Sequence, residues 1–465
     1  MELLRIEQLG VQTADGTELV EPMSLRLHAG SNITILGETG SGKSLLIQAI
    51  MGVLPNGLNA SGHIFVENCK ICEKTDRLWG KTLVMLPQEP RRSLDPIMNI
   101  GRQLWESFRF VAGLAHNAAQ TASEQALQRL GLPTAAKRYP HQLSGGMAQR
   151  AAFAIATAAG GKILLADEPT KGLDPASKNS VIALLKQAYQ NGGGLLTITH
   201  DIDVARALGG YIFVMKRGKL VEQGDAERLL TAPQADYTQA LIAADPQNWQ
   251  PNHLQKIAEN RPLVSVKNLS VARGKRTLFQ GLSFDLHQGE ILGVVGASGI
   301  GKSTLADVLC GILKPQAGEV IWHSQNHKKH QVLKLYQDPP EAFAPTVSLQ
   351  KLLDDVIDYH RLDRSQIPML LEQLALSPHI LQRTAENVSG GELQRVAILR
   401  ALLLNPVLLF ADEVTSRLDP ITQQETLRLL IDQCRARHCA LIIVSHDPHL
   451  IAKSCDKVVD LEQYC

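Results

Sequence analysis

The stretch Gly37-Glu38-Thr39-Gly40-Ser41-Gly42-Lys43-Ser44 decides the fold of this chain, because it fits the phosphate-loop pattern G-x-x-x-x-G-K-[ST]. The apolar run 33–36 before it predicts a buried strand, and the apolar stretch 45–51 after it predicts a helix. Glycines allow the tight turn that points backbone N–H groups at a phosphate, and the helix adds the positive end of its dipole. The stretch therefore predicts a nucleotide site; a glycine-rich strand-to-helix turn is the alternative.

The same arrangement occurs a second time. Residues 296–304 are Gly-Ala-Ser-Gly-Ile-Gly-Lys-Ser-Thr, and the apolar run 291–295 precedes them. Lys302 follows Lys43 by 259 positions. A repeat of this length indicates a duplicated domain, since solenoid repeats have periods of roughly 20–50 residues.

Four further features follow each phosphate loop in the same order. They are a glutamine (Gln88, Gln337), a Ser-Gly-Gly stretch (144–146, 389–391), an Asp-Glu pair (167–168, 412–413) and a histidine (His200, His446). The spacing from serine to glutamate is identical in the two copies, whereas lysine to glutamine spans 45 positions in the first and 35 in the second. The duplication therefore retains the core of the unit and trims a peripheral part.

Length and composition limit the possible classes of protein. A chain of 465 residues is too long for one core and predicts two or three domains. Its net charge of +1 gives no general attraction for nucleic acid or anionic lipid. The N-terminus carries charges too early for a signal peptide, and the best candidate for a membrane span, residues 401–411, is short and contains Asn405-Pro406. We therefore expect a cytoplasmic protein whose membrane role, if it has one, goes through partners.

Cysteine and histidine are present in small groups. There are seven cysteines, an odd number thinly scattered, which favours reduced thiols over a disulfide framework. Cys69 and Cys72 form a single C-x-x-C, which could help bind a metal or act in redox chemistry; we favour two thiols at a strand end. The stretch from His323 to His330 offers a metal or anion site, and here we favour an exposed turn between strands.

The duplication divides the chain into a first domain at residues 1–245, a linker at 246–261 and a second domain at 262–465. Around the linker, residues 245–252 contain two prolines and little apolar content. Strands alternate with helical stretches and carry the motifs at their ends, so we expect an α/β fold with a mainly parallel sheet. The inserts 96–144 and 345–389 are mostly helical in pattern and predict a helical subdomain in each copy.

The acidic pairs supply the chemistry that a phosphate loop lacks. Asp167 and Asp412 each end an apolar run, where a strand presents a carboxylate at its tip as a Mg²⁺ ligand beside the loop hydroxyl of Ser44. A strand-end aspartate that only caps a turn is the alternative. Glu168 and Glu413 come next and are candidates to orient or deprotonate the attacking water, although a glutamate beside an aspartate is also common on solvated surfaces.

The serines and histidines of the repeated motifs could have structural roles as well as functional ones. Ser144 and Ser389 each precede Gly-Gly and a long helical run. Serine is a good N-cap, and Gly-Gly at a helix N-terminus is itself an anion site, so the two roles are compatible. His200 and His446 each end an apolar strand, where a single histidine is more often structural; their repetition favours a function.

This ordered and doubled set of motifs resembles the ATP-binding cassette (ABC) ATPases over nearly the whole sequence. The chain looks like two complete cassettes in tandem. The resemblance implies two P-loop NTPase domains of α/β class, each with a mainly parallel core sheet, an antiparallel β part and a helical subdomain. It also implies hydrolysis of ATP with Mg²⁺ as cofactor.

In this family two cassettes pack head to tail and enclose two ATP molecules, which implies a role for each motif. Lys43 and Asp167 would work with Ser389-Gly390-Gly391, and Lys302 and Asp412 with Ser144-Gly145-Gly146. The implied catalytic residues are Glu168, His200, Glu413 and His446. The implied nucleotide-binding residues are Gly37, Glu38, Thr39, Gly40, Ser41, Gly42, Lys43, Ser44, Gln88, Ser144, Gly145, Gly146, Asp167, Asp174, Gly296, Ala297, Ser298, Gly299, Ile300, Gly301, Lys302, Ser303, Thr304, Gln337, Ser389, Gly390, Gly391, Asp412 and Asp419. Of these, the implied Mg²⁺ ligands are Ser44, Gln88, Asp167, Ser303, Gln337 and Asp412.

Within the family, residues 87–101 and 233–241 resemble the importers of peptides, nickel and metal chelates, and residues 54–58 and 412–419 are somewhat more similar to the nickel branch. The resemblance implies two integral-membrane permease subunits and an extracytoplasmic solute-binding protein as partners. It implies no direct contact with the solute, and a peripheral location at the cytoplasmic face of the inner membrane.

Two alternatives stay open. One is an accessory ATPase of a soluble enzyme complex such as the carbon–phosphorus lyase system. The other is a tandem cassette protein of ribosomes or nucleic acid, which a net charge near zero and a linker without a long charged run disfavour, so no nucleic-acid partner is expected. One departure from the family concerns adenine: many members hold it with an aromatic ring, whereas Thr13 and Arg273 stand at about the matching positions here. An arginine plane can still stack on a base.

Overall fold

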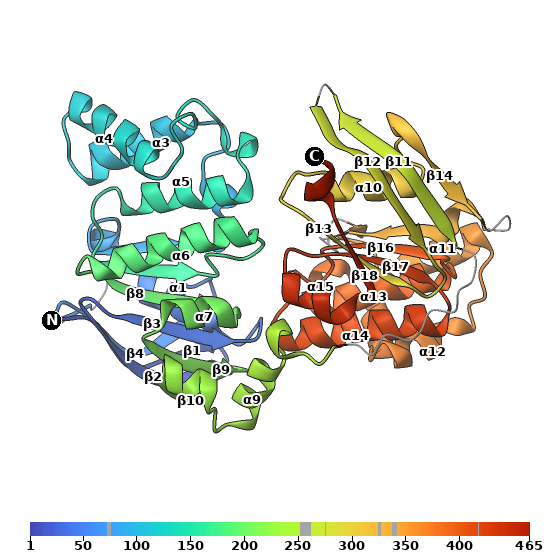
Figure 1. Cartoon of the computed structure of the whole chain (residues 1–465). Helices are drawn as coiled ribbons and strands as arrows, with labels where there is room; N and C mark the ends of the chain where they lie inside the picture. The colour runs from blue at the N-terminus through green and yellow to red at the C-terminus, as the bar shows by residue number, and fades with distance from the viewer. Residues whose placement is uncertain (72–75, 252–261, 275, 324–326, 337–341, 417) are drawn as a thin grey trace. The chain divides into compact units, whose positions relative to one another are not determined.

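The computed structural model describes residues 1–71, 76–251, 262–274, 276–323, 327–336, 342–416 and 418–465. The chain forms two compact units, Met1–Ala243 and Ala244–Cys465, called here the first and the second unit (Figure 1). Gln337 and most of the predicted linker lie outside the described residues. Within the residues that are described, no helix is both long and apolar enough to cross a bilayer.

Two sheets form the framework of the first unit. One is antiparallel with the strand order β2-β1-β4-β5, and the other has the order β10-β9-β3-β8-β7-β6. In the second of these sheets β10 is antiparallel to β9, and the remaining strands run parallel. The strands are β1 (Glu2–Thr13), β2 (Glu18–His28), β3 (Asn32–Gly37), β4 (Leu58–Val66), β5 (Cys69–Lys70), β6 (Leu83–Leu86), β7 (Ile163–Asp167), β8 (Gly194–Thr199), β9 (Tyr211–Lys216) and β10 (Lys219–Asp225).

The helices of the first unit cover the sheets and form the predicted helical insert. In Figure 1 the insert, with α3 and α4, lies beyond α5 as seen from the strands. The α-helices are α1 (Lys43–Met51), α2 (Pro90–Ser93), α3 (Ile100–Glu106), α4 (His116–Arg129), α5 (Gly145–Thr157), α6 (Pro175–Gln190), α7 (Ile202–Leu208), α8 (Ala226–Thr231) and α9 (Asp236–Ala243). A π-helix η2 (Ser107–Val111) continues α3, and short 3₁₀ turns occur at η1 (Asp76–Leu78) and η3 (Pro140–Gln142).

The second unit repeats this plan, with fewer strands among the residues that the structure describes. A three-stranded antiparallel sheet has the order β12-β11-β14, and a fully parallel sheet has the order β15-β16-β17-β13-β18. Its strands are β11 (Val264–Arg273), β12 (Arg276–Leu286), β13 (Ile291–Val295), β14 (Ala317–Trp322), β15 (Val332–Leu335), β16 (Leu408–Asp412), β17 (Ala440–Val444) and β18 (Lys457–Asp460). Its α-helices are α10 (Lys302–Leu309), α11 (Leu349–His360), α12 (Gln366–Gln373), α13 (Gly390–Leu403), α14 (Pro420–Ala436) and α15 (Pro448–Ser454). Its 3₁₀ turns are η4 (Pro246–Asn248), η5 (Lys329–Gln331), η7 (Pro378–Gln382), η8 (Ala385–Asn387) and η9 (Leu461–Tyr464).

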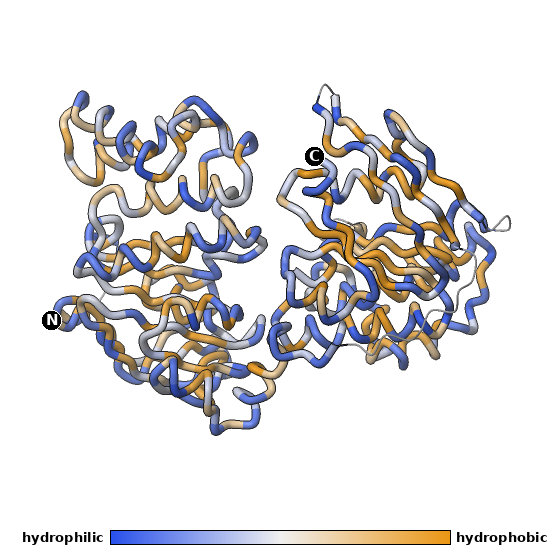
Figure 2. The backbone as a smooth tube through the Cα atoms, in the orientation of Figure 1, coloured by the Kyte–Doolittle hydropathy of each residue, from blue (hydrophilic) through white to orange (hydrophobic). Residues whose placement is uncertain are grey.

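Each parallel sheet has a hydrophobic core on both faces, because successive side chains of a strand point to opposite sides. In β8, Leu196 and Ile198 pack with the antiparallel sheet and α1, whereas Leu195 packs with the helices on the other face. In β17, Ile442 and Leu441 are divided in the same way. Figure 2 shows the hydrophobic colour concentrated along these strands. Burial on both faces explains the continuous apolar runs in the sequence.

The predicted fold class is confirmed. The run 33–36 lies in β3, the run 291–295 is β13, and the predicted strand 211–215 lies in β9. The inserts contain the predicted helices, α3 and α4 in the first unit and α11 and α12 in the second. The two units differ at one edge of the parallel sheet, where the first unit adds β10. Trp249, in the stretch predicted as the linker, packs against the second unit's core, and the neighbouring η4 contacts α15.

Candidate functional site

Each phosphate loop joins the carboxyl end of a central parallel strand to the helix that follows. The first leads from β3 into α1, and the second from β13 into α10. Gly42 and Gly301 are the N-cap residues of these helices, with φ of 91° and 119°, a region in which a side chain would be strained. The predicted strand–loop–helix context is therefore present twice, and each helix directs its N-terminus into the loop.

The lysine of each loop is held by the loop itself. Lys43 Nζ donates hydrogen bonds to the carbonyls of Gly37 at 2.8 Å and Glu38 at 2.7 Å. Lys302 Nζ does the same with the carbonyls of Gly296 at 2.8 Å and Ala297 at 3.1 Å. Both side chains are buried. The ammonium groups are thus anchored at the loops, where a phosphate would bind.

A contact that the sequence did not predict ties each loop to the C-terminal part of its own unit. In the first unit, the N–H of Glu38 donates to the hydroxyl of Tyr237 in α9 at 3.0 Å. In the second, the N–H of Ala297 donates to Glu462 Oε1 in η9 at 3.0 Å. A neutral phenol and a carboxylate therefore hold equivalent points of the two loops. Tyr237 lies 199 positions from Glu38, so no local pattern could reveal the contact.

Asp167 stands at the tip of β7, beside the first phosphate loop. Ser44 Oγ donates to Asp167 Oδ1 at 3.3 Å, so the two predicted Mg²⁺ ligands already face each other. Burial raises the pKa of Asp167 to about 6, although the hydrogen bond from Ser44 opposes this shift. Oxygen donors at the mouth of a phosphate loop fit Mg²⁺, which binds to one or two protein oxygens in addition to substrate phosphates.

Asp412 occupies the matching tip of β16, but a lysine lies against it. Lys334 Nζ is 3.2 Å from Asp412 Oδ2, and the side chain of Lys334 is 8% exposed. The same ammonium is 3.4 Å from Asp307 Oδ1 and donates to the carbonyl of Ser303 at 3.3 Å. The sequence did not single out Lys334, because a lysine within a short strand has the pattern of a solvent-facing residue.

The glutamate after each aspartate is joined to the predicted histidine. His200 Nδ1 and Glu168 Oε1 are 2.8 Å apart, and His446 Nε2 and Glu413 Oε1 are 2.7 Å apart. Burial disfavours the Glu168 carboxylate, but the charge of His200 and the hydrogen bond with it outweigh burial and lower the pKa of Glu168. Glu168 is therefore ionised at neutral pH, the state that a base or a water-orienting group requires.

Both glutamates have left-handed backbone conformations. The φ angle is 46° at Glu168 and 51° at Glu413, values that residues other than glycine seldom adopt. Such strain costs about 1–3 kcal/mol per residue and persists where the surrounding structure imposes it, often at functional sites. The adjacent strand holds each glutamate by its backbone. The N–H of Glu168 donates to the carbonyl of Ile198, and the N–H of Glu413 donates to the carbonyl of Val444. The turn directs each carboxylate to its histidine.

The Ser-Gly-Gly stretches start the long helices α5 and α13. Ser144 and Ser389 are the N-caps, and their hydroxyls accept the N–H of Met147 and Glu392. Glu392 also accepts the hydroxyl of Ser389 at 2.7 Å, which completes a capping box in the second unit. The capping role that the sequence allowed is thus present in both units, and in the second the Glu392 carboxylate also accepts the N–H of Ser389 at 3.2 Å.

The second glycine of each stretch lies close to the helix that follows the acidic pair. A methyl group on Gly146 would stand 2.3 Å from Ser177 Oγ, and one on Gly391 would stand 2.6 Å from Thr422 Cγ2. The predicted Asp174 and Asp419 are the N-caps of these helices, α6 and α14, and accept the N–H of Ser177 and Thr422, each at 3.1 Å. A larger residue at either glycine would therefore push against the first turn of the helix that the aspartate caps, so the Ser-Gly-Gly stretch packs closely on that turn.

The remaining predicted positions are distributed as follows. Gln88 follows β6, which pairs with the strand that ends at Asp167, so it lies at the same edge of the sheet. Its counterpart Gln337 is outside the described residues. Thr13 ends β1, and its hydroxyl donates to the carbonyl of Thr17. The other predicted loop residues, Thr39, Gly40, Ser298, Gly299, Ile300 and Thr304, lie in the two loops or the first turn of α10.

The smaller groups of cysteine and histidine form no site that the structure describes. The six described cysteines are free thiols, in agreement with the prediction, and Cys72 lies outside the described residues. Among the residues described, no group of three or more His, Cys, Asp or Glu could hold a metal ion. His323 follows β14 and His330 lies in η5 before β15, so the predicted turn does connect two strands; residues 324–326 are not described.

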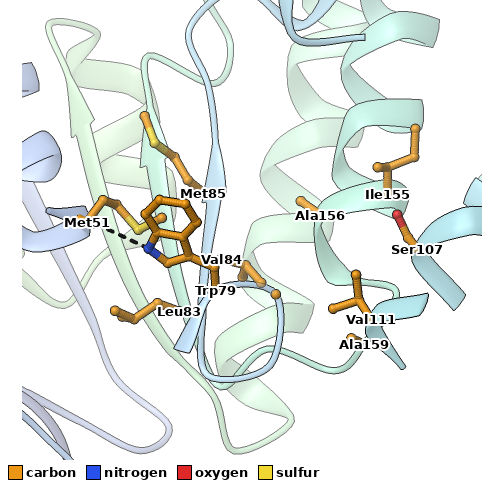
Figure 3. A pocket seen from close by; sticks show the side chains of 11 residues that line it. Met51, Trp79, Leu83, Val84, Met85, Ser107, Val111, Ile155, Ala156 and Ala159 are labelled. Atoms are coloured by element: carbon orange, nitrogen blue, oxygen red, sulfur yellow. Dashed lines mark hydrogen bonds between the residues drawn. The ribbon is translucent and has the colours of Figure 1, made fainter. Parts of the chain in front are cut away.

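An apolar pocket of about 210 Å³ lies in the first unit, between the parallel sheet and the helical insert (Figure 3). Met51, Trp79 and Met85 line one side, and Val111 and Ile155 the other. Trp79 Nε1 donates to the carbonyl of Met51 at 3.2 Å, the dashed line in the figure, and its ring stays 41% exposed. An open apolar pocket rimmed by an exposed indole is typical of a binding surface.

Known proteins share this arrangement of motifs. The ABC transporter family model matches residues 20–171 and 279–416, and each segment contains a phosphate loop, a Ser-Gly-Gly stretch and an Asp-Glu pair. The chain belongs to the ABC transporter family. As a member it is an ATPase whose hydrolysis of ATP is coupled to transport.

Relatives match both units together. An uncharacterized ABC transporter ATP-binding protein, YejF of Escherichia coli (strain K12), is 33% identical over 503 residues, covering 99% of this chain and 94% of YejF. The glutathione import ATP-binding protein GsiA of Salmonella typhi is 32% identical, covering 95% of this chain and 81% of GsiA. Among solved structures, an archaeal ribosome recycling factor, aABCE1, in complex with a ribosomal stalk protein covers 98% of this chain and 87% of its own, with a TM-score of 0.65 at 19% identity, which shows the shared fold alone.

Proposed function

We propose that this ABC ATPase energises an importer of peptides, nickel or metal chelates by acting on separate membrane permeases. Support comes from the relatives that match both units, one of which is named for glutathione import, glutathione being a tripeptide. The observation that carries the proposal is that each unit pairs the glutamate after its strand-end aspartate with a histidine, Glu168 with His200 and Glu413 with His446. Two permease subunits and an extracytoplasmic solute-binding protein are the proposed partners, and the proposed location is the cytoplasmic face of the membrane.

Each ATP site is proposed to use both units. The first site would comprise Lys43, Asp167 and Glu168 with the Ser389-Gly390-Gly391 stretch of the second unit; the second site would comprise the reciprocal set. The N-terminus of a long helix with Gly-Gly in its first turn is a ready anion site, and α5 and α13 both provide one. Closure of the two units over ATP would then couple binding at the loops to movement of the permeases.

Within each site, the residues have distinct tasks. Lys43 binds phosphate oxygens once it leaves the loop carbonyls, and Ser44 and Asp167 supply oxygen ligands for Mg²⁺. When bound, Mg²⁺ neutralises charge on the phosphates. Glu168 orients the attacking water and accepts its proton, while His200 fixes the direction of the carboxylate and stabilises its charge. Lys302, Ser303, Glu413 and His446 are proposed to do the same in the second site, with Gln88 and Gln337 beside the metal or water and Asp174 and Asp419 between the sites.

The apolar pocket is proposed as the place where a cytoplasmic helix of a permease docks. It joins the parts that a permease must move, because Met51 ends the helix of the phosphate loop and Met85 lies three positions before Gln88. Val111 lines the pocket from the helical insert, and Ile155 lines it from α5, the helix that the Ser-Gly-Gly stretch begins. An apolar helix face in this pocket would link the solute pathway to the ATP site.

The test is isolation of the tagged chain from detergent-solubilised membranes of its own host, followed by mass spectrometry. Two integral-membrane permeases are the expected partners. Val111→Asp places a charge in the pocket and should release the permeases while ATP hydrolysis by the isolated chain persists; Val221→Asp, at an exposed position of β10, should retain them. Co-purification of ribosomes or of a soluble enzyme complex, without permeases, would contradict the importer assignment.

A further inference from the structure

The two Mg²⁺-binding aspartates have different neighbours at an equivalent point of the fold. In the first unit, β6 pairs with β7 so that Met85 lies opposite Leu165, two residues before Asp167. In the second, β15 pairs with β16 so that Lys334 lies opposite Phe410, two residues before Asp412. The register therefore places Met85 and Lys334 at the same position. One is an apolar side chain that lines the pocket, and the other is a cation.

A second exchange accompanies the first. The position five residues after the loop lysine is Gln48 in α1 and Asp307 in α10. In the part of the chain that the structure describes, Gln48 Oε1 is buried and has no hydrogen-bond partner. Asp307 instead has its Oδ1 3.4 Å from Lys334 Nζ, and its side chain is 39% exposed. The second unit thus has a lysine and a second carboxylate where the first unit has neither.

The ammonium of Lys334 lies among the groups expected to surround the metal. Its Nζ is 3.2 Å from Asp412 Oδ2 and donates to the backbone carbonyl of Ser303 at 3.3 Å, so it contacts two of the predicted ligand residues of the second site. In the first site, Ser44 Oγ and Asp167 Oδ1 contact each other directly. A cation bound to the ligand carboxylate neutralises part of its charge and repels Mg²⁺, so it competes with the metal for Asp412.

We propose that Lys334 is a built-in counter-cation that competes with Mg²⁺ for Asp412 and makes the second ATP site respond weakly to the metal. Asp307 is the alternative partner that accepts the ammonium when Mg²⁺ binds. In the described part of the first site Met85 stands where the second site has Lys334, so the first site takes up Mg²⁺ with ATP first. This proposal rests on the proposed role of Asp412 as a Mg²⁺ ligand. Lys334 acts through Asp412 and is a positioning residue for the metal.

The test measures how much Mg²⁺ contributes to nucleotide binding at the second site alone. In full-length protein carrying Lys43→Ala, which silences the first loop, binding of a fluorescent non-hydrolysable ATP analogue is titrated in excess Mg²⁺ and in EDTA. The dissociation constant in EDTA divided by the dissociation constant in Mg²⁺ reports the contribution of the metal. Lys334→Met should raise this ratio roughly tenfold, the size expected when a hydrogen bond to a charged group no longer competes.

Three companion variants make the result specific to the charge of Lys334. Lys334→Arg retains the cation and should leave the ratio near that of the parent. Asp307→Asn removes the alternative partner and should lower the ratio further, the opposite sign to Lys334→Met. Met85→Lys, measured with Lys302→Ala in place of Lys43→Ala, should lower the ratio at the first site. None of these readouts depends on turnover.

Two outcomes would overturn the proposal and can be told apart. If Asp412→Asn abolishes the dependence on Mg²⁺ while Lys334→Met leaves the ratio unchanged, Lys334 does not compete with the metal, and the assignment of Asp412 stands. If Asp412→Asn leaves the dependence on Mg²⁺ intact, Asp412 is not the metal ligand, and the proposal fails with that assignment. Thermal unfolding of each variant beside its parent verifies that the second unit is folded.

Discussion

The two halves of this chain share the residues proposed to be catalytic but differ in the charges around them. Glu168–His200 and Glu413–His446 are alike in distance and in backbone conformation. The aspartates that precede them are not: Asp167 is buried with Ser44 as its neighbour, whereas the carboxylate of Asp412 is paired with Lys334. The proposed hydrolytic pair is thus present in both units, through Nδ1 of His200 and Nε2 of His446, and the larger difference lies around the proposed metal ligands.

The loops differ in a second respect. The same backbone N–H is bound by the phenol of Tyr237 in the first unit and by the carboxylate of Glu462 in the second. The first unit has α8 and α9 after its last sheet strand, and the second ends in η9. Two different C-terminal segments thus restrain equivalent loops, which indicates that the restraint itself is what both units require.

The largest effect is expected when both glutamates are changed. Glu168→Gln with Glu413→Gln should lower kcat on the order of a thousandfold while ATP still binds, because each site loses the group that accepts the proton of water. At limiting Mg²⁺, Glu168→Gln alone should remove most of the turnover, and Glu413→Gln alone should remove less. Steady-state phosphate release measures these rates. Wild-type turnover in the double variant would show that the base is misassigned.

Replacing Asp167 or Asp412 by asparagine should change the stability of its unit in opposite directions. Asp167 has a pKa of about 6 in the folded protein and 3.8 as its ordinary value, so it destabilises the folded state increasingly from pH 3.8 to 6 and by a constant amount above pH 6. Without nucleotide, Asp167→Asn should stabilise the first unit by at most about 3 kcal/mol at pH 7.5 and by about half as much at pH 5. Asp412→Asn should destabilise the second unit, because Lys334 loses a partner.

Thermal unfolding at the two pH values provides the measurement. The folded state binds the proton of Asp167 more tightly than the unfolded state, so the stability of the parent falls as pH rises from 3.8 to 6. Asp167→Asn does not titrate and lacks this loss, so the variant is the more stable at pH 7.5. A lower Tm for Asp167→Asn at pH 7.5 would contradict the account of its burial. An unchanged Tm for Asp412→Asn would contradict the importance of the ion pair with Lys334.

The pairing of the units is tested by Ser389→Arg. A bulky cation at the N-cap of α13 should disable the Lys43 site more than the Lys302 site, by roughly a hundredfold, because misplacement by about 1 Å can cost this much. Ser144→Arg is the matched variant and should show the reverse preference. Site-resolved trapping of a photoreactive nucleotide gives the readout. If Ser389→Arg chiefly affects the Lys302 site, head-to-tail pairing is wrong.

The smallest effect is expected at the restraint of the first loop. Tyr237→Phe removes the acceptor for the N–H of Glu38 and should raise KM for ATP roughly twofold to tenfold, the range for one neutral hydrogen bond, with kcat little changed. In the second unit, Glu462→Gln retains an acceptor for Ala297 and should have less effect. An equal loss of kcat in Tyr237→Phe would show a role beyond positioning of the loop.

Much of this architecture could be predicted from local patterns. The loops, the apolar strands and the Ser-Gly-Gly helices are encoded within short stretches, and their repetition made each assignment stronger. The left-handed conformation of Glu168 could not be predicted, because no glycine marks it and the strain is imposed by β8. Lys334 and Tyr237 were missed for another reason: their contacts depend on strand register and on segments distant in sequence.

The most direct test of the central claim, that the two sites differ in their use of Mg²⁺, needs only the unmodified chain. Mg²⁺ is titrated into the protein mixed with a fluorescent non-hydrolysable ATP analogue, held below the concentration that fills the sites without the metal, and the fluorescence of the bound nucleotide is followed. Competition by Lys334 for Asp412 predicts two steps of equal amplitude separated by roughly tenfold in Mg²⁺ concentration, merging in Lys334→Met. A single step in the unmodified chain would contradict the account.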